Sequence, residues 1–316
     1  MGTVVDNADR PELRSAGTQR LRRHEWVSVL ALAARSRRGV IGLSLGLFVV
    51  AVAVVGPFVA PHSPTEFVTS AFAPPSAQAV LGGDSLGRDV LSRVLNGGWV
   101  LLSMAAAATA LGVSVGAIAG IAAAFYKGWP DGLIMRAVDI ILCFPQIVFA
   151  LLLVSIAGPK PWLVVFAVGI SHAPQVARVI RSSSLDICEK DYIKAMELLR
   201  IPSRKIITGD ILPNLVTPLM VEIGLRLTWS IVFIAGLSFI GFGLQPPAPN
   251  WGLMLNENRI GLVSNPWGVV VPVILLALLT IGTNTFTDAI ARVSIGVDRR
   301  MGEELLLGAL PLETES

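Results

Sequence analysis

Two residues of opposite charge lie inside an apolar segment, where each charge needs an ion-pair partner or a functional role. Glu222 and Arg226 stand at i and i+4, acid first, the order that suits an ion pair along one helix face. A charge at mid-bilayer is costly, so both side chains are expected to face protein or water. They either form a structural pair or line a path for a charged solute. Asn284, in another apolar segment, is expected to hydrogen-bond across helices.

The other residues that could bind a metal or take part in catalysis are not spaced for either role. His24, His62 and His172 are scattered and show no metal-ligand spacing. The apolar segments contain no convergent acids and no Ser/His arrangement, and the chain has no GxxxxGK[ST] phosphate loop. We therefore predict no catalytic residue, metal or cofactor, which argues against a membrane-embedded enzyme. An ion-coupled secondary transporter stays open as an alternative, with Glu222 and Arg226 as its only candidate site.

A polar and basic stretch, residues 187–214, lies between two long apolar segments. Its spacing predicts a short helix with one apolar stripe, because the stripe residues fall at i, i+3, i+4 and i+7. Pro202 should end that helix, and Ser203 can begin a second one. The pattern alone leaves two possibilities: the stripe packs on this chain, or it docks into a partner's groove. The stripe residues are Tyr192, Ala195, Met196 and Leu199.

The composition predicts an all-α, polytopic membrane protein. The 316 residues are 53% hydrophobic and 15% charged, with a mean hydropathy of +0.69, whereas soluble domains have about 25% charged residues. Six apolar runs are long enough to span a bilayer. In the second run, Gly112, Gly116 and Gly120 recur every four residues, a spacing that lets two helices pack closely. It is equally possible that they are ordinary glycines of a glycine-rich membrane helix. The predicted spans are Val40–Val59, Trp99–Phe125, Leu133–Ile156, Trp162–Val179, Pro213–Phe242 and Val269–Ile290.

The basic residues orient these spans. Twenty of the 25 Lys and Arg residues fall in segments that would be cytoplasmic if both termini are inside, and four fall outside. The net charge of +3 therefore indicates membrane orientation and no nucleic-acid partner. An amphipathic helix over 25–34 should lie on the membrane surface, after a disordered beginning, and a short helix is expected near Gly252–Arg259. Cys143 and Cys188 are expected to be reduced.

Several stretches resemble one family. DYIKAMELLRIPSRKIITGDILPN (191–214) resembles the "EAA" loop of membrane subunits of ATP-binding-cassette importers, with Lys194, Ala195 and Met196 at the E-A-A positions. LGGDSLGRDVLSRVLNGG (81–98) and LSFIGFGLQPPAPNWGLML (237–255) resemble segments of the dipeptide/oligopeptide/nickel permeases, C-type (second) subunit. RAVDIILCFPQI (136–147) and ARVIRSSSL (177–185) also match, so the likeness covers most of residues 40–290.

The resemblance implies a type I importer permease in the plasma membrane of a prokaryote, surrounded by membrane lipid. It implies a cytoplasmic tail (1–38), a first span with an external loop (39–98), a five-helix core (99–292) and a second tail (293–316). The implied partners are a B-type permease, one or two cytoplasmic ATPase subunits and an external solute-binding protein. The implied cargo is a di- or oligopeptide, with nickel chelates or haem as alternatives.

The resemblance also assigns residues. ATPase coupling falls to the stripe residues together with Arg200 and Pro202, and the binding-protein contact falls to Gln245, Pro246, Asn250 and Trp251. The sequence departs from the family where Arg200 replaces a glycine that permits a tight turn. We expect Pro202 to make this turn instead. For Asp84, Arg88 and Asp89 in the external segment, a capped turn before a helix is slightly favoured over binding-protein contact.

Overall fold

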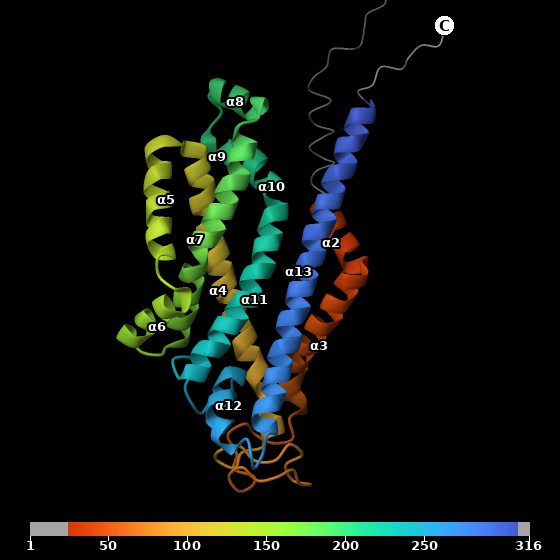
Figure 1. Ribbon diagram of the computed structural model, residues 1–316, viewed down its shortest axis with the longest axis vertical. Coiled ribbons are helices and arrows are strands. Elements are labelled where there is room, and N and C mark those ends of the chain that lie inside the picture. Colours follow the sequence, from red (N-terminus) through yellow and green to blue (C-terminus); the bar gives the residue numbers. More distant parts are fainter. Residues whose placement is uncertain (1–24, 309–316) are drawn as a thin grey trace, which may run out of the picture.

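Long helices run side by side along one axis in the computed structural model, which describes residues 25–308 (Figure 1). Within these residues there is no β-strand, only two isolated bridges. The long helices are α3 (Arg37–Val59), α4 (Val90–Tyr126), α7 (Pro161–Cys188), α11 (Val216–Ile240) and α13 (Trp267–Gly308). The shorter ones are α2 (Glu25–Arg35), α5 (Gly128–Leu142), α6 (Gln146–Ala157), α8 (Asp191–Leu198), α9 (Ser203–Ile206), the π-helix η1 (Ile207–Ile211), α10 (Leu212–Asn214), α12 (Trp251–Asn258) and the 3-10 helix η2 (Arg259–Gly261).

Five helices are long and apolar enough to cross a membrane, and they match five of the six predicted spans. The predicted third span, Leu133–Ile156, is not a single straight helix. The chain there forms α5 and α6, which are bent by 84° at a break. Pro145 lies at this break, and proline cannot donate the backbone hydrogen bond that would continue the helix. The pair counts as a sixth span only if the two helices cross together.

Three helices extend beyond the predicted limits. Helix α4 begins at Val90, because the Asp89 carboxylate accepts a hydrogen bond from the Ser92 N–H at 2.9 Å and caps it. This confirms the capped turn expected in the 81–98 segment. Helix α7 continues to Cys188, and α13 continues through much of the predicted 293–316 tail to Gly308. The predicted disorder near the N-terminus and the final residues of that tail lie outside the described residues.

The largest helix contact joins α4 to α7, and small residues make it possible. A Cβ added at any of three α4 glycines would lie only 2.5–2.6 Å from a backbone carbonyl oxygen of α7, closer than real Cβ contacts allow. The predicted close approach is therefore confirmed, and it is an approach within this chain. The glycine–carbonyl pairs are Gly112 with Gly169, Gly116 with Ala173, and Gly120 with Ala177.

Helix α2 confirms the predicted helix over 25–34 and packs on its own chain. Val29 and Ala33 are buried and form a cluster with Ala289 and Ile290 of α13. Leu32, on another side of α2, is half exposed. The position of this helix on a membrane surface stays a prediction.

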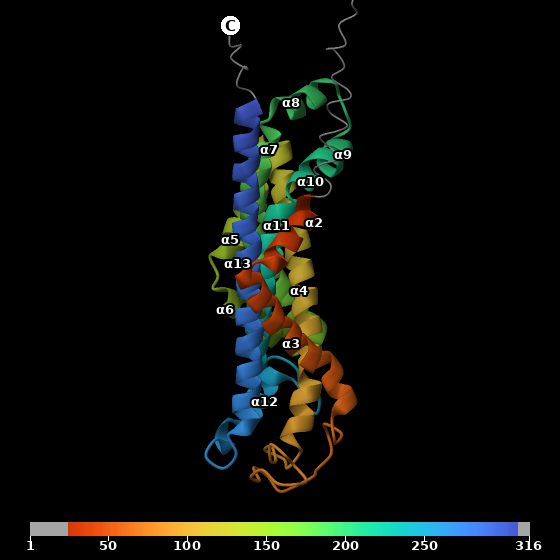
Figure 2. The same cartoon turned by 90° about the vertical axis from the view of Figure 1, so that its right-hand side faces the viewer.

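The two ends of the bundle differ. Figures 1 and 2 show α8 and α9 at one end, which we call the α8 end, and α12 with the loop 60–89 at the other, which we call the α12 end. The segments predicted to lie inside and outside the cell are thereby separated along the long axis, as the alternation of spans requires.

Candidate functional site at the α8 end

Helix α8 is held to its own chain by one side. Ile193 is fully buried in a cluster that includes Ile206 and Ile211, and Met196 packs partly against the same cluster. The opposite side carries exposed apolar groups: Leu198 is 85% exposed and Leu199 75%. Helix α8 therefore has an inner apolar face that packs on this chain and an outer one that does not. Docking of the outer face into a partner stays a prediction.

The predicted stripe is partly wrong in its membership. Tyr192, Ala195 and Leu199 are exposed as expected, but Met196 leans inward. Ile193, which anchors the helix, and Leu198, which is the most exposed of its leucines, were not predicted. Two apolar sets alternate around this short helix, and periodicity alone does not say which of them faces the protein.

The turn after α8 is made by Arg200 and not by Pro202, contrary to expectation. Arg200 has a φ of 55°, the left-handed conformation that glycine adopts most easily. The Ile201 N–H donates to the Met196 carbonyl at 3.1 Å and the Arg200 N–H to the Glu197 carbonyl at 2.9 Å, which is a Schellman helix end. Pro202 then caps the start of α9, where its missing N–H costs nothing.

A π-helix connects this turn to α11. The segment Ile207–Ile211 winds with wider turns than an α-helix, a feature that often marks functional positions. Ile211 is fully buried and fixes the segment to the same cluster as Ile193. Burial raises the pKa of Asp210. Helix α8 is thus joined to α11 by a short, well-packed connection.

The ion pair predicted in the fifth span exists. Arg226 Nε lies 3.1 Å from Glu222 Oε2 on α11, and both residues are buried. Arg226 also donates to the Gln175 side chain of α7, so the pair ties two helices together, which favours the structural interpretation. His172, buried nearby on α7, has no hydrogen bond to either ring nitrogen among the described residues. Asn284 lies exposed on α13, and no hydrogen bond across helices is found for it in the described part of the chain.

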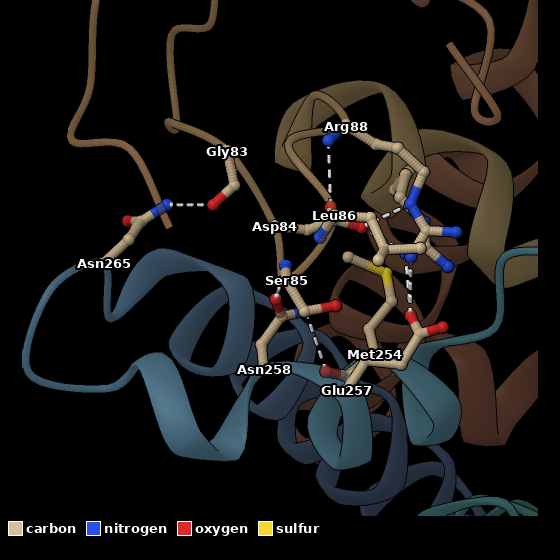
Figure 3. Close-up of polar contacts among 10 residues, drawn as sticks. Gly83, Asp84, Ser85, Leu86, Arg88, Met254, Glu257, Asn258 and Asn265 are labelled. Carbon is tan, nitrogen blue, oxygen red and sulfur yellow. Dashed lines mark hydrogen bonds and ion pairs between the residues drawn. The ribbon is translucent and has the colours of Figure 1, made fainter. Parts of the chain in front are cut away.

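A second polar cluster lies at the α12 end (Figure 3). The Asp84 carboxylate accepts from Arg88 Nε at 2.7 Å and also from Arg93, while Glu257 on α12 accepts from Arg88 at 3.2 Å and from Arg93 at 2.7 Å. Burial alone would raise the pKa of Asp84, but the Arg93 charge and the hydrogen bonds from Arg88, Arg93 and Leu86 hold it below its usual value. Arg93 and Glu257 were not predicted as members of this cluster.

Hydrogen bonds extend this connection between the loop and α12. The Ser85 N–H donates to Asn258 Oδ1 at 3.0 Å, and Asn265 Nδ2 donates to the Gly83 carbonyl at 2.9 Å (Figure 3). Asn265 Nδ2 also donates to the Leu81 carbonyl at 2.9 Å. The side chains of Asp84 and Arg88 are buried and bond to other groups of this chain. Their predicted role as part of a structural turn is therefore favoured over a contact with a binding protein.

The structure contradicts two of the four predicted binding-protein contacts. Asn250 is fully buried and caps α12 by accepting from the Gly252 N–H at 3.0 Å. Trp251 is also fully buried, and its indole N–H donates to the Val94 carbonyl at 2.8 Å. Neither side chain can reach a partner. Gln245 and Pro246 are exposed and remain predicted contacts.

Comparisons with known proteins agree with this architecture. Residues 112–295 match the family described as "Binding-protein-dependent transport system inner membrane component". Glutathione transport system permease protein GsiD of Escherichia coli O6:K15:H31 is 34% identical over 81% of this chain and 86% of its own length. A protein of Brucella suis biovar 1 named as a peptide transport system permease is 35% identical over 82% of this chain and 88% of its own.

A solved structure is also similar. It is an inward-facing form of the MetNI methionine ABC transporter, with 17% identity and a TM-score of 0.48. The alignment covers 61% of this chain and 93% of the other.

Proposed function

This chain belongs to the family of binding-protein-dependent transport system inner membrane components, and we propose that it forms half of a membrane path for di- or oligopeptides. It is a multi-pass permease subunit of an ATP-binding-cassette importer. The peptide cargo is suggested by relatives whose names specify glutathione and peptides. Glutathione is itself a small peptide with free carboxylates, so the two names describe one chemical class.

The outer face of α8 is the observation that supports coupling to an ATPase. Leu198 is 85% exposed and Leu199 75%, while the other face of α8 is packed against this chain. The two leucines therefore form an exposed apolar surface. In our proposal this face, from Tyr192 to Leu199 with the turn at Arg200 and Pro202, docks into a groove of a cytoplasmic ATPase subunit. ATP hydrolysis then belongs to that partner, because this chain has no phosphate-binding loop.

The remaining parts of the proposal concern orientation and assembly. The distribution of Lys and Arg supports a cytoplasmic α8 end with both chain termini on that side. A second permease completes the path, with Glu222 and Arg226 either lining it or only bracing α11 against α7. A solute-binding protein delivers the peptide to the α12 end, where Gln245 and Pro246 are exposed.

Transport by the reconstituted complex tests this proposal. The chain is assembled in vesicles with its second permease, its ATPases and its binding protein, and uptake of labelled glutathione and of labelled dipeptides is measured. We expect uptake that needs both ATP hydrolysis and the binding protein. Uptake that continues without ATP hydrolysis but stops when a proton gradient is collapsed would overturn the proposal in favour of a secondary transporter.

A further inference from the structure

An apolar groove of about 370 Å³ runs between α4 and the segment that joins α9 to α11. It is more than twice the size of the roughly 150 Å³ apolar cavity that holds benzene in a protein interior, so a hydrocarbon chain fits in it. Ser114 supplies the only polar side chain of its lining. The lining residues are Ser114, Ala117, Ile118, Ile121 and Ala122 of α4, with Ile207 and Leu212 opposite them.

The groove opens on the side of a membrane-spanning helix. Its α4 wall from Ser114 to Ala122 covers about 12 Å along the helix axis and lies in the part of α4 nearest the α8 end. Ile118 is 69% exposed, so the opening is not closed by this chain. Because the hydrocarbon core of the bilayer surrounds such a helix, lipid is the first substance that an apolar opening there meets.

Positive charge stands at one end of the groove. Arg204 is three residues before Ile207, so it shares a helix face with this wall residue and lies one turn nearer the α8 end. Figure 2 shows α8, α9 and α10 following one another from that end. Arg204 and Lys205 are both exposed, and neither has an ion-pair partner among the side chains described, those of residues 27–296. The only carboxylate in 203–214, Asp210, leaves this segment net positive.

We propose that this groove binds an anionic phospholipid, with an acyl chain between α4 and Ile207–Leu212 and the phosphate at Arg204 and Lys205. Cations at the cytoplasmic surface attract anionic lipid, and each contributes to affinity near the membrane. A helix of another protein would also cover an apolar wall, but only an anionic ligand would also engage the exposed Arg204, which lies one helical turn from Ile207. The inference rests on the orientation proposed above, with the α8 end on the cytoplasmic side, and not on the identity of the cargo.

The groove lies beside the connection between α8 and α11. One of its walls includes Ile207 of η1, the π-helix in that connection. In the proposal, a bound acyl chain therefore lies between this wall and α4.

Photo-crosslinking from inside the groove tests the proposal. Benzoylphenylalanine replaces Ile118 in the complete complex, in vesicles with equal amounts of phosphatidylglycerol and phosphatidylcholine, and adducts are identified by mass after illumination. We expect phosphatidylglycerol adducts to exceed phosphatidylcholine adducts by at least about fivefold, the factor that a single Lys or Arg contributes near an anionic surface. A second probe, at Ser114, covers the case in which benzoylphenylalanine at position 118 itself fills the groove.

Paired variants separate the two cations from general surface charge. In the Arg204→Gln/Lys205→Gln variant the lipid ratio should fall toward one. In the control Arg136→Gln/Arg292→Gln, which removes two exposed cations of α5 and α13, it should not change. Equal adducts with both lipids, an adduct with another protein, or no adduct from either probe would each overturn the proposal.

Discussion

Arg93 and Glu257 are 164 residues apart in the chain, yet Arg93 donates to the Glu257 carboxylate at 2.7 Å. This contact joins the first turn of α4 to α12, and Arg93 is fully buried. Two arginines share two carboxylates here, so the cluster is neutral as a whole. Loss of either acid leaves a buried positive charge without compensation.

Glu257→Gln should therefore destabilise the α12 end. Removing one partner of a buried ion pair costs about 3–5 kcal/mol, because the remaining charge stays buried. Thermal unfolding of the purified complex measures the loss. The control is Asp139→Asn, which breaks an ion pair with Arg178 whose side chains are about 60% exposed and which should cost about 0–1 kcal/mol. Equal losses in both variants would contradict the importance of the buried cluster.

Acid should loosen the same region through Asp84. Its pKa is held below the usual value in the folded chain, so the folded state binds this proton less readily than the unfolded state does. The stabilisation is complete above the ordinary Asp pKa of about 3.9 and is lost as the pH falls through the lower, folded value. Hydrogen exchange of the loop 60–89 should stay constant from neutral pH to about 5 after correction for the intrinsic rate, then increase. In Asp84→Asn this acid-dependent component should be absent.

The sequence predicted the helical architecture well because hydrophobic length is local information. It located five spans, the two helices of the 187–214 loop and the short helix at Trp251. It failed at Pro145, where the break in the third span depends on one residue within an otherwise apolar run. It also failed for Trp251 and Met196, since the side that an apolar residue faces depends on neighbours distant in the chain. Glu257 could not be assigned to Arg93 for the same reason.

At the turn after α8, replacing Arg200 with glycine should not destabilise the protein. A non-glycine residue in the left-handed conformation costs about 1–2 kcal/mol, and glycine avoids this cost but is more disordered in the unfolded chain. Arg200→Gly should leave thermal stability unchanged or raise it slightly. Arg200→Val should lower it, because a branched side chain tolerates positive φ poorly. Destabilisation by glycine equal to that by valine would show that the arginine side chain itself holds the turn.

Gly116 should be intolerant of even one added methyl group. A Cβ there would lie 2.5 Å from the Ala173 carbonyl oxygen, so α4 and α7 must separate. We expect Gly116→Ala to cost about 1–3 kcal/mol in unfolding experiments in detergent, as overpacking does. The control is Gly236→Ala in α11, where an added Cβ has no neighbour within 4 Å. That variant should be neutral or stabilising, since alanine favours helix more than glycine does.

The outer face of α8 gives the most direct test of coupling. Leu198 and Leu199 are exposed, so replacing both with aspartate should change the stability of this chain by only about 0.5 kcal/mol per site. In the complex the same change would bury two carboxylates in an apolar contact, which is strongly unfavourable. Binding-protein-stimulated ATP hydrolysis and uptake should be lost, while membrane insertion and thermal stability are kept. The matched control is Gly209→Asp, which adds the same type of charge in the same loop at a position with open space around it. Normal stimulated hydrolysis by the double variant would mean that the partner ATPase docks elsewhere, whereas failure of both variants would mean that negative charge anywhere in the loop is harmful. Loss in the α8 variant alone assigns the contact to the exposed leucines, because the anchored face containing Ile193 is unchanged in both.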